Sequence, residues 1–252
     1  MEKNPKHIVI TGAASGIGLA LVKVFLNHGA IVFGVDQAPN QPIKHENYTY
    51  LKKDIASKEG VDAMFEAAKK HLGTIDIFIA NAGIAAYSAM HTMDYETIAS
   101  LFNINTLSLI YSAKRFKQLM GDHPFQFVAM ASVMAYWPLA GYSVYAASKA
   151  AIMTFVEGFR QELPKHQRLH TVFPVSTKTA FFTRAKQPHK PWLMQNPDHV
   201  AKVVFKGVKN NKKRLYPSKL FRVTHALCPW CLWFYKKREK AMLKAISEET
   251  LR

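Results

Sequence analysis

The chain has 252 residues, of which 49% are hydrophobic, 12% aromatic and 20% charged, so it can bury a full core. This composition excludes a disordered tail, a collagen-like chain and a heptad-repeat protein, and one domain is the default expectation. The 34 Lys and Arg residues outnumber the 17 Asp and Glu residues, and the net charge of +17 predicts an anionic neighbour: nucleic acid, an anionic membrane surface or an acidic substrate.

Two cysteines, Cys228 and Cys231, are too few for a disulfide framework and indicate a reducing compartment such as the cytoplasm. Their CxxC spacing lacks the further ligands of a closed zinc site, so we expect two thiols in apolar surroundings and no metal. Residues 1–7 are polar and do not resemble a signal peptide. The most apolar window, residues 226–235, contains Pro229 and is about half as long as a membrane span, so we expect no spanning helix.

Short apolar runs alternate with longer segments of helical period along the first 180 residues. In chain order, this pattern predicts a strand over residues 7–11, a helix over 17–28, a strand over 30–35, a helix over 59–72, a strand over 75–80, a long helix over 95–120, a strand over 125–131, a helix over 145–163 and a strand over 169–173. We therefore expect an α/β fold with a single doubly wound, Rossmann-like parallel sheet and helices on both faces.

The pattern changes after residue 173. Residues 177–197 contain three prolines, which predicts a long loop over the substrate site. Asp198 is expected to cap a helix that runs to about residue 210, and residues 214–217 form a short final strand. The expected organisation is one domain over residues 1–218 and an atypical basic, aromatic C-terminal extension over residues 219–252.

A glycine-rich turn joins the first predicted strand to the first predicted helix. Its sequence, Thr11-Gly-Ala-Ala-Ser-Gly-Ile-Gly18, places Gly12, Gly16 and Gly18 there. Without Cβ atoms the backbone can turn tightly and approach a pyrophosphate, which the N–H groups at the start of the helix then face. The turn lacks the GK[ST] ending of a phosphate-transfer loop, so a dinucleotide is favoured over a nucleoside triphosphate.

Asp36 ends the second predicted strand. In this position a carboxylate can accept hydrogen bonds from the ribose hydroxyls of the adenosine half of a dinucleotide, and it would repel a 2′-phosphate. Neither Ala14 nor Gln37 supplies the cation that a phosphorylated ribose needs. The sequence therefore favours NAD(H) over NADP(H).

Four polar residues are candidates for the chemistry. Tyr145 and Lys149 lie four residues apart and share one face of a predicted helix. A phenol has a pKa of about 10 and is a poor acid–base catalyst at neutral pH until a nearby cation stabilises its anion. Ser132, at a predicted strand end, offers a hydroxyl for a substrate carbonyl, and Asn105 offers an amide that could order a water.

Together these motifs resemble the short-chain dehydrogenase/reductase family over about residues 6–179. The resemblance rests on Thr11–Gly18, Asn81-Ala82-Gly83, Asn105, Ser132 and Tyr145-Ala-Ala-Ser-Lys149. It implies that Tyr145 is the acid–base residue, that Lys149 lowers its pKa and binds the nicotinamide ribose, that Ser132 polarises the substrate oxygen and that Asn105 holds a proton-relay water. It also implies cofactor contacts at Gly12, Ser15, Ile17, Gly18, Asp36, Asp54, Ile55, Asn81, Gly83, Tyr145, Lys149 and Thr179.

The chain departs from the family pattern at several points. Ala80 stands where the family commonly has Asn, Ser108 stands where Gly often follows the helix Asn, and Pro174-Val175 replaces a Pro-Gly pair beside the nicotinamide. The usual glycine-rich C-terminal ending, which forms a tetramer surface, is missing. We therefore do not carry over the family's tetramer, and expect a homo-oligomer with a dimer favoured.

The excess positive charge is concentrated beyond residue 201, where many Lys and Arg face only Glu239, Glu248 and Glu249. Between the basic clusters, residues 220–235 hold several aromatic side chains, including Trp230 and Trp233. Such a segment fits the headgroup boundary of an anionic bilayer, and it equally fits a helix that packs on the domain or on a second subunit. No nucleic-acid module is visible, so we expect no nucleic-acid partner.

These observations predict a cytoplasmic NAD(H)-dependent oxidoreductase that interconverts a secondary alcohol and a ketone by hydride transfer, with residues 1–218 as its NAD-binding catalytic domain. A lipophilic or acyl-chain substrate is expected because the candidate pocket wall is apolar and aromatic. The wall comprises Met134, Tyr136, Trp137, Leu139, Tyr142, Phe181, Phe182 and Trp192. The alternative is a non-catalytic NAD-binding regulatory or scaffold protein, which has no reason to assemble the four polar residues. A sugar-nucleotide epimerase or dehydratase usually needs a longer C-terminal substrate domain.

Overall fold

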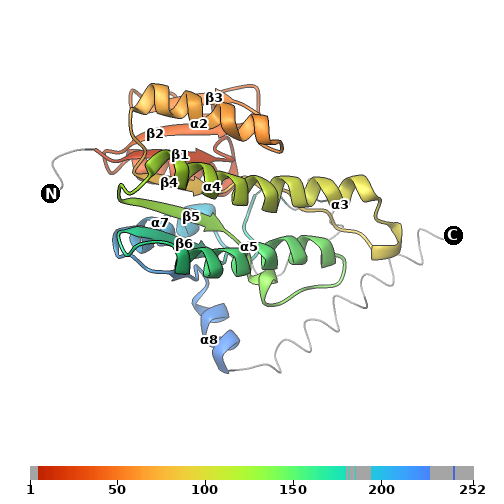
Figure 1. Cartoon of the computed structure of the whole chain (residues 1–252). Coiled ribbons are helices and arrows are strands. Elements are labelled where there is room, and N and C mark those ends of the chain that lie inside the picture. The colour runs from red at the N-terminus through yellow and green to blue at the C-terminus, as the bar shows by residue number, and fades with distance from the viewer. Residues whose placement is uncertain (1–4, 180, 182–184, 186–193, 228–240, 242–252) are drawn as a thin grey trace.

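Seven parallel strands form one sheet in the order β3-β2-β1-β4-β5-β6-β7 (Figure 1). The computed structural model describes residues 5–179, 181, 185, 194–227 and 241. In chain order the strands are β1 (His7–Thr11), β2 (Ile31–Asp36), β3 (Tyr48–Lys52), β4 (Ile77–Ala80), β5 (Phe125–Met130), β6 (Gln167–Val172) and β7 (Arg214–Leu215). The strand order reverses between β1 and β4, so the predicted doubly wound, Rossmann-like α/β sheet is confirmed.

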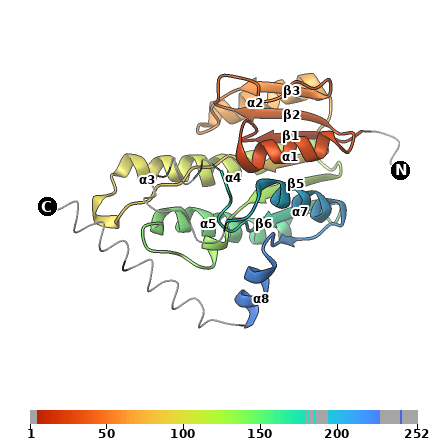
Figure 2. The same ribbon diagram turned by 180° about the vertical axis from the view of Figure 1, so that it is seen from behind.

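Helices cover both faces of the sheet, as two opposite views show (Figures 1 and 2). On one face lie α1 (Gly16–Leu26) and α7 (Pro197–Lys209). On the other lie α2 (Lys58–Leu72), α4 (Ser108–Met120) and α5 (Ser143–Glu162). The remaining helices are η1 (Met90–Thr92), α3 (Tyr95–Phe102), η2 (Asn103–Leu107), η3 (Val133–Ala135) and α8 (Lys219–Leu227). Within the described ranges, no helix has the length and hydropathy needed to cross a bilayer.

The central strands are apolar on both sides because helices bury both sides, and every residue of β4 is buried. On the α2 and α4 side, the ring of Phe78 lies 4.9 Å from that of Phe65 and 5.4 Å from that of Phe127, measured between centroids. Each fully buried side chain of this size contributes about 1.5–3 kcal/mol. This packing fixes β4 and β5, whose carboxyl ends lead to Asn81 and Ser132.

The predicted helix over residues 95–120 is helical from end to end, but its α-helical hydrogen bonding is interrupted. The segment forms α3, then a π-helical turn, η2, and then α4. Such turns insert one residue into the helical ladder and often occur at functional sites, and here the turn contains Asn105. The Ser108 hydroxyl donates to the main-chain oxygen of Ile104 at 2.6 Å within this turn. Apolar periodicity continues through the inserted residue, so the pattern alone did not reveal it.

Three further element predictions need correction. Edge strand β3 was not predicted, because its half-buried pattern lacks a continuous apolar run. Helix α5 begins at Ser143, two residues before Tyr145. The N-cap of α7 is Asn196, whose side-chain oxygen accepts from the main-chain N–H of Asp198 at 2.9 Å, so Asp198 is a first-turn residue and not the cap.

Several sequence predictions fall outside the described residues. They concern most of the loop over residues 177–197, including Phe182 and Trp192, and the C-terminal extension from residue 228 onward apart from residue 241, including Cys228 and Cys231. The boundary between residues 218 and 219 remains a prediction. The described start of the extension is helix α8.

Candidate active site

A cavity of about 700 Å³ opens at the carboxyl ends of the parallel strands. Its walls come from the segments that follow β1, β2, β3, β4, β5 and β6, and helix α8 adds a further wall. Ligands of doubly wound sheets bind at this edge, near the point where the strand order reverses. The volume falls within the range of about 300–1,000 Å³ that is typical of small-molecule sites.

Most of the predicted site residues line this one cavity. They are Gly12, Ser15, Ile17, Asp36, Asp54, Ile55, Asn81, Gly83, Ser132, Tyr145, Lys149 and Thr179. Gly18 and Asn105 do not line it. Gly18 packs against the main chain of Gly12, and the Asn105 side chain is hydrogen-bonded to the main chain of Ile84. Cofactor contact through Gly18 and water binding through Asn105 remain predictions.

The glycine turn is held in a shape that side chains would prevent. Gly12 has a positive φ of +68°, and a Cβ on Gly18 would lie 1.8 Å from the main-chain oxygen of Gly12. The Asn81 side-chain amide donates to the main-chain oxygens of Thr11 at 3.0 Å and of Gly12 at 3.2 Å. This amide joins the loop after β4 to the loop after β1.

Helix α1 begins at this turn, and its first residues lie on the cavity wall. Its N-cap residue, Ser15, makes no side-chain capping hydrogen bond. The first N–H groups of a helix have no partner within the helix, and they carry the positive end of its dipole. Ser15, Gly16 and Ile17 all line the cavity. These residues fit a pyrophosphate, which needs close backbone approach and N–H donors.

Asp36 is held by main-chain donors on the cavity wall. One carboxylate oxygen accepts from the N–H of Ala14 at 2.9 Å and the other from the N–H of Ala38 at 3.0 Å. Lys53, which the sequence reasoning did not consider, also lines the cavity, and its main-chain N–H donates to the main-chain oxygen of Asp36 at 2.8 Å. Strand β3 brings it there, so recognising that strand would have revealed it.

Ser132, Tyr145 and Lys149 come together deep in the cavity wall, and each is buried. Ser132 follows β5, and its side-chain oxygen accepts from the main-chain N–H of Met134 at 3.1 Å. Its side chain is also hydrogen-bonded to that of Tyr145. The Lys149 ammonium donates to the main-chain oxygen of Met130 at 2.9 Å and lies 5.9 Å from the centre of the Tyr145 ring.

Burial shifts the pKa values of both titratable groups. It raises the pKa of Tyr145 to about 12, an effect that the hydrogen bond with Ser132 partly opposes. It lowers the pKa of Lys149 to about 8. The resemblance implied a lowered pKa for Tyr145, whereas the net shift here is upward because desolvation of the phenolate is the largest cause. Perturbed groups of this kind are typical of active sites.

Asn105 is fully buried and ties the cavity wall together. Its side-chain oxygen accepts from the main-chain N–H of Ile84 at 2.8 Å. Its amide donates to the main-chain oxygen of Ile84 at 2.9 Å and to the Ser148 hydroxyl at 3.0 Å. Both amide hydrogens are therefore used, so the side chain positions the loop after β4 against α5.

The substrate end of the cavity is largely apolar. Of the predicted wall residues, Met134, Trp137, Leu139 and Phe181 line it. Tyr136 and Tyr142 do not, because Tyr136 packs on Phe173 and Tyr142 is buried against Tyr87. The sequence reasoning missed Leu220, Phe221 and Thr224 of α8, which also line it. Among the described residues, no group of three His, Cys, Asp or Glu side chains could hold a metal ion.

A family model described as short chain dehydrogenase matches residues 6–190 of this chain. The chain belongs to the short-chain dehydrogenase family. It is 32% identical over 152 residues to a 3-beta-hydroxysteroid dehydrogenase from Comamonas testosteroni, a match that covers 58% of this chain and 60% of that relative. The chain spans about three fifths of the length of the curated relatives that it matches at 31% and 32% identity.

Solved structures of short-chain dehydrogenases share the fold. A short-chain dehydrogenase from Burkholderia cenocepacia in complex with NADP has a TM-score of 0.79 at 20% identity, over 96% of this chain and 99% of that one. One from Burkholderia phymatum in complex with NAD has a TM-score of 0.77 at 18% identity, over 90% and 94%. The similarity extends over nearly the whole sheet and its covering helices.

Proposed function

We propose that this short-chain dehydrogenase is an NAD(H)-dependent oxidoreductase that interconverts a secondary alcohol and a ketone. One observation carries the proposal: Ser132, Tyr145 and Lys149 line the same cavity as the glycine turn and Asp36. A non-catalytic regulatory or scaffold protein would need the turn and the carboxylate, but it would gain nothing from burying a lysine and a tyrosine at the far end.

The nicotinamide cofactor, when bound, supplies or accepts the hydride. Because burial raises the pKa of Tyr145 to about 12, its phenol keeps its proton at neutral pH and can donate it to a carbonyl oxygen during reduction. The Ser132 hydroxyl, whose oxygen accepts from Met134, can donate to the same carbonyl oxygen and orient it. Lys149, whose pKa is lowered to about 8, is mainly a cation at pH 7 and stabilises the phenolate that forms.

Asp36 supports NAD(H) as the cofactor. The two solved relatives carry NAD in one case and NADP in the other, so the choice of cofactor depends on this chain's own residues. A carboxylate held in place by Ala14 and Ala38 accepts ribose hydroxyls well and repels a 2′-phosphate. Lys53 on the same wall would attract a 2′-phosphate and so favour NADP(H). Because its side chain is only half-buried, solvent screens its charge, and we expect its effect to be smaller than that of Asp36.

The apolar side chains at the substrate end support a lipophilic or acyl-chain ketone. Trp137, Leu139, Phe181 and Leu220 line this end of the cavity. A sugar would leave its hydroxyls without partners against such a wall, at a cost of about 1–3 kcal/mol for each unpaired group.

The direct test is a panel of aliphatic, steroid and acyl ketones with purified full-length protein, followed by NADH and NADPH absorbance. We expect reduction of lipophilic ketones, with NADH preferred, and little or no turnover of sugars. Tight NADH binding without turnover of any ketone across a broad panel would instead favour the regulatory protein.

We also propose a homodimer in a reducing, cytoplasmic compartment, with residues 1–218 as the catalytic domain. The face formed by α4 and α5 supports a dimer, because Leu107 before α4 is 54% exposed and the stacked rings of Phe155 and Phe159 are partly exposed on α5. Sedimentation velocity should give the mass of two chains. The Leu107→Glu variant should shift the protein toward monomer, and a monomeric wild type would contradict the dimer.

A further inference from the structure

Helix α8 has an inner surface that completes the cavity. Phe221 is 4% exposed, and its ring contacts that of Trp137 edge-on, with centroids 4.5 Å apart. Leu220, Phe221 and Thr224 all line the cavity. The helix is thus a wall of the substrate end and not an appendage of the domain.

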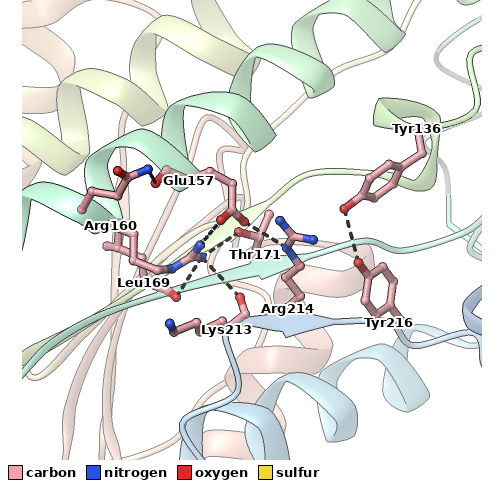
Figure 3. Close-up of polar contacts among 9 residues, drawn as sticks. Tyr136, Glu157, Arg160, Leu169, Thr171, Lys213, Arg214 and Tyr216 are labelled. Carbon is pink, nitrogen blue, oxygen red and sulfur yellow. Dashed lines mark hydrogen bonds and ion pairs between the residues drawn. The ribbon is translucent and has the colours of Figure 1, made fainter. Parts of the chain in front are cut away.

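The segment before α8 is fastened to the body of the protein (Figure 3). On β7, the Arg214 guanidinium donates to the Glu157 carboxylate of α5 at 3.0 Å. One residue after β7, the hydroxyls of Tyr216 and Tyr136 lie 3.3 Å apart, and the Tyr216 ring stacks on Phe173. These contacts fix the position at which α8 begins. The fold therefore also determines which side of α8 faces away from the cavity.

The outer surface of α8 combines apolar and basic side chains. Among the described residues, five large hydrophobic side chains are more than half exposed, and two of them are on α8: Leu220 at 60% and Val223 at 51%. Lys219 and Arg222 are exposed beside them. A helix that presents apolar side chains next to cations is typical of one lying in the headgroup boundary of a membrane.

The stretch of chain that leads into α8 and forms it carries a large excess of positive charge. In residues 197–227 the sequence holds the following cations against the single acid Asp198: Lys202, Lys206, Lys209, Lys212, Lys213, Arg214, Lys219 and Arg222. A second copy of this surface would carry the same charge, so two α8 helices would repel each other. A nucleic-acid backbone would meet the cations but would leave Leu220 and Val223 without apolar contacts. An anionic lipid layer satisfies both kinds of side chain.

We propose that α8 docks on an anionic lipid surface through Lys219, Leu220, Arg222 and Val223, and that the cavity takes its lipophilic substrate from that surface. Leu220 joins the two roles, because it lines the cavity and is also exposed at its mouth. The docking half of this proposal stands on α8 alone, whereas the delivery half rests on the proposed function.

Docking is tested by co-sedimentation of the full chain with vesicles of phosphatidylcholine containing phosphatidylglycerol, and with vesicles of phosphatidylcholine alone. We expect binding to the anionic vesicles that weakens as salt is raised. The double variant Lys219→Gln/Arg222→Gln should bind at least about tenfold more weakly. Its matched control is Lys69→Gln/Lys70→Gln, an exposed basic pair on α2 with the same change in net charge, which should bind like the wild type.

The apolar contribution is tested separately with Val223→Ser, and Met90→Ser is its control at a similarly exposed site away from α8. Val223→Ser should reduce vesicle binding severalfold and Met90→Ser should not. Wild-type protein that stays in the supernatant at low salt, or equal losses for α8 and control variants, would overturn the docking surface. So would light scattering in which the α8 variants change the mass of the protein, since that result would mark a contact between subunits.

Delivery is tested with a long-chain ketone held in the anionic vesicles and a short, water-soluble ketone. Val223 does not line the cavity, so the Val223→Ser protein should turn over the soluble ketone at the wild-type rate. With the long-chain ketone, however, vesicles should no longer accelerate its turnover as they do for the wild type. An equal vesicle effect in both proteins would contradict delivery. Vesicle binding without reduction of either ketone would contradict the proposed function while leaving the docking surface intact.

Discussion

The Lys149 ammonium donates to the main-chain oxygen of Met130 at 2.9 Å and lies 5.9 Å from the centre of the Tyr145 ring. Met130 ends β5, two residues before Ser132, so one strand end and one helix bring together the lysine, the phenol and the serine. The cost of this arrangement is a buried cation, which is visible in the pKa of Lys149, lowered from 10.5 to about 8. The proposed catalytic role, and not stability, accounts for a lysine buried here.

Replacing Lys149 with Met should therefore stabilise the protein at pH 7. The lowered pKa means that the buried cation destabilises the folded state by about 3 kcal/mol at pH 7. The variant avoids this cost but loses the hydrogen bond to Met130, worth about 1 kcal/mol, so its free energy of unfolding should be about 2 kcal/mol higher. Since the folded pKa lies below the unfolded one, wild-type stability rises between pH 8 and 10.5, and the advantage of the variant should shrink over that window. Urea unfolding of both proteins at pH 7 and pH 10 measures the stability difference and its change with pH. A variant that is less stable than the wild type at pH 7 would contradict the cost assigned to the buried cation.

Replacing Asp36 with Ala should narrow the preference for NADH over NADPH. The variant loses a carboxylate that accepts ribose hydroxyls and repels a 2′-phosphate, so NADH binding should weaken about tenfold while NADPH binding holds or improves. Lys53→Ala should act the other way and weaken NADPH alone. Fluorescence titration of both cofactors measures this, and equal affinities in the wild type would remove the role of Asp36.

Gly18→Ala should be strongly destabilising, by about 2 kcal/mol or more, because the added Cβ would lie 1.8 Å from the main-chain oxygen of Gly12. Gly158→Ala is the matched control, since it lies within α5 and nothing is within 4 Å of its added Cβ. It should stabilise the protein by about 0.5–1 kcal/mol through helix propensity. Thermal unfolding compares the pair, and similar melting temperatures would contradict the packing of α1 against the turn.

Asn105→Ala should destabilise the fold by about 2 kcal/mol, because it removes a fully buried amide and leaves the N–H and oxygen of the half-buried Ile84 without this partner. Ser108→Ala, which removes a hydroxyl bonded only within its own turn, should cost less than about 1 kcal/mol. Denaturant unfolding separates the two. An Asn105→Ala variant with wild-type stability and abolished turnover would instead support the proton-relay role that the family resemblance implied.

The sequence predicted most of the sheet and many of the residues that line the cavity, because both depend on local patterns. Buried strands such as β4 are continuous apolar runs, and the glycine turn carries its own signature. The edge strand β3 and the π-helical turn at Asn105 have no such signal. Lys53 follows β3, so its place in the cavity wall depends on the pairing of β3 with β2. The contact of Trp137 with Phe221 joins residues far apart in the chain, so only the folded structure reveals α8 as a cavity wall.

The central claim is that the Tyr145 hydroxyl moves the proton in an NAD(H)-dependent ketone reduction. The most direct test compares NADH oxidation by the wild type and by Tyr145→Phe with a lipophilic ketone, and measures NADH binding by fluorescence for both. The variant should lose at least about a hundredfold in turnover and retain its NADH affinity, because the ring still packs. Tyr142→Phe, a buried neighbour outside the cavity lining, should keep turnover. Substantial ketone reduction by Tyr145→Phe would contradict the account.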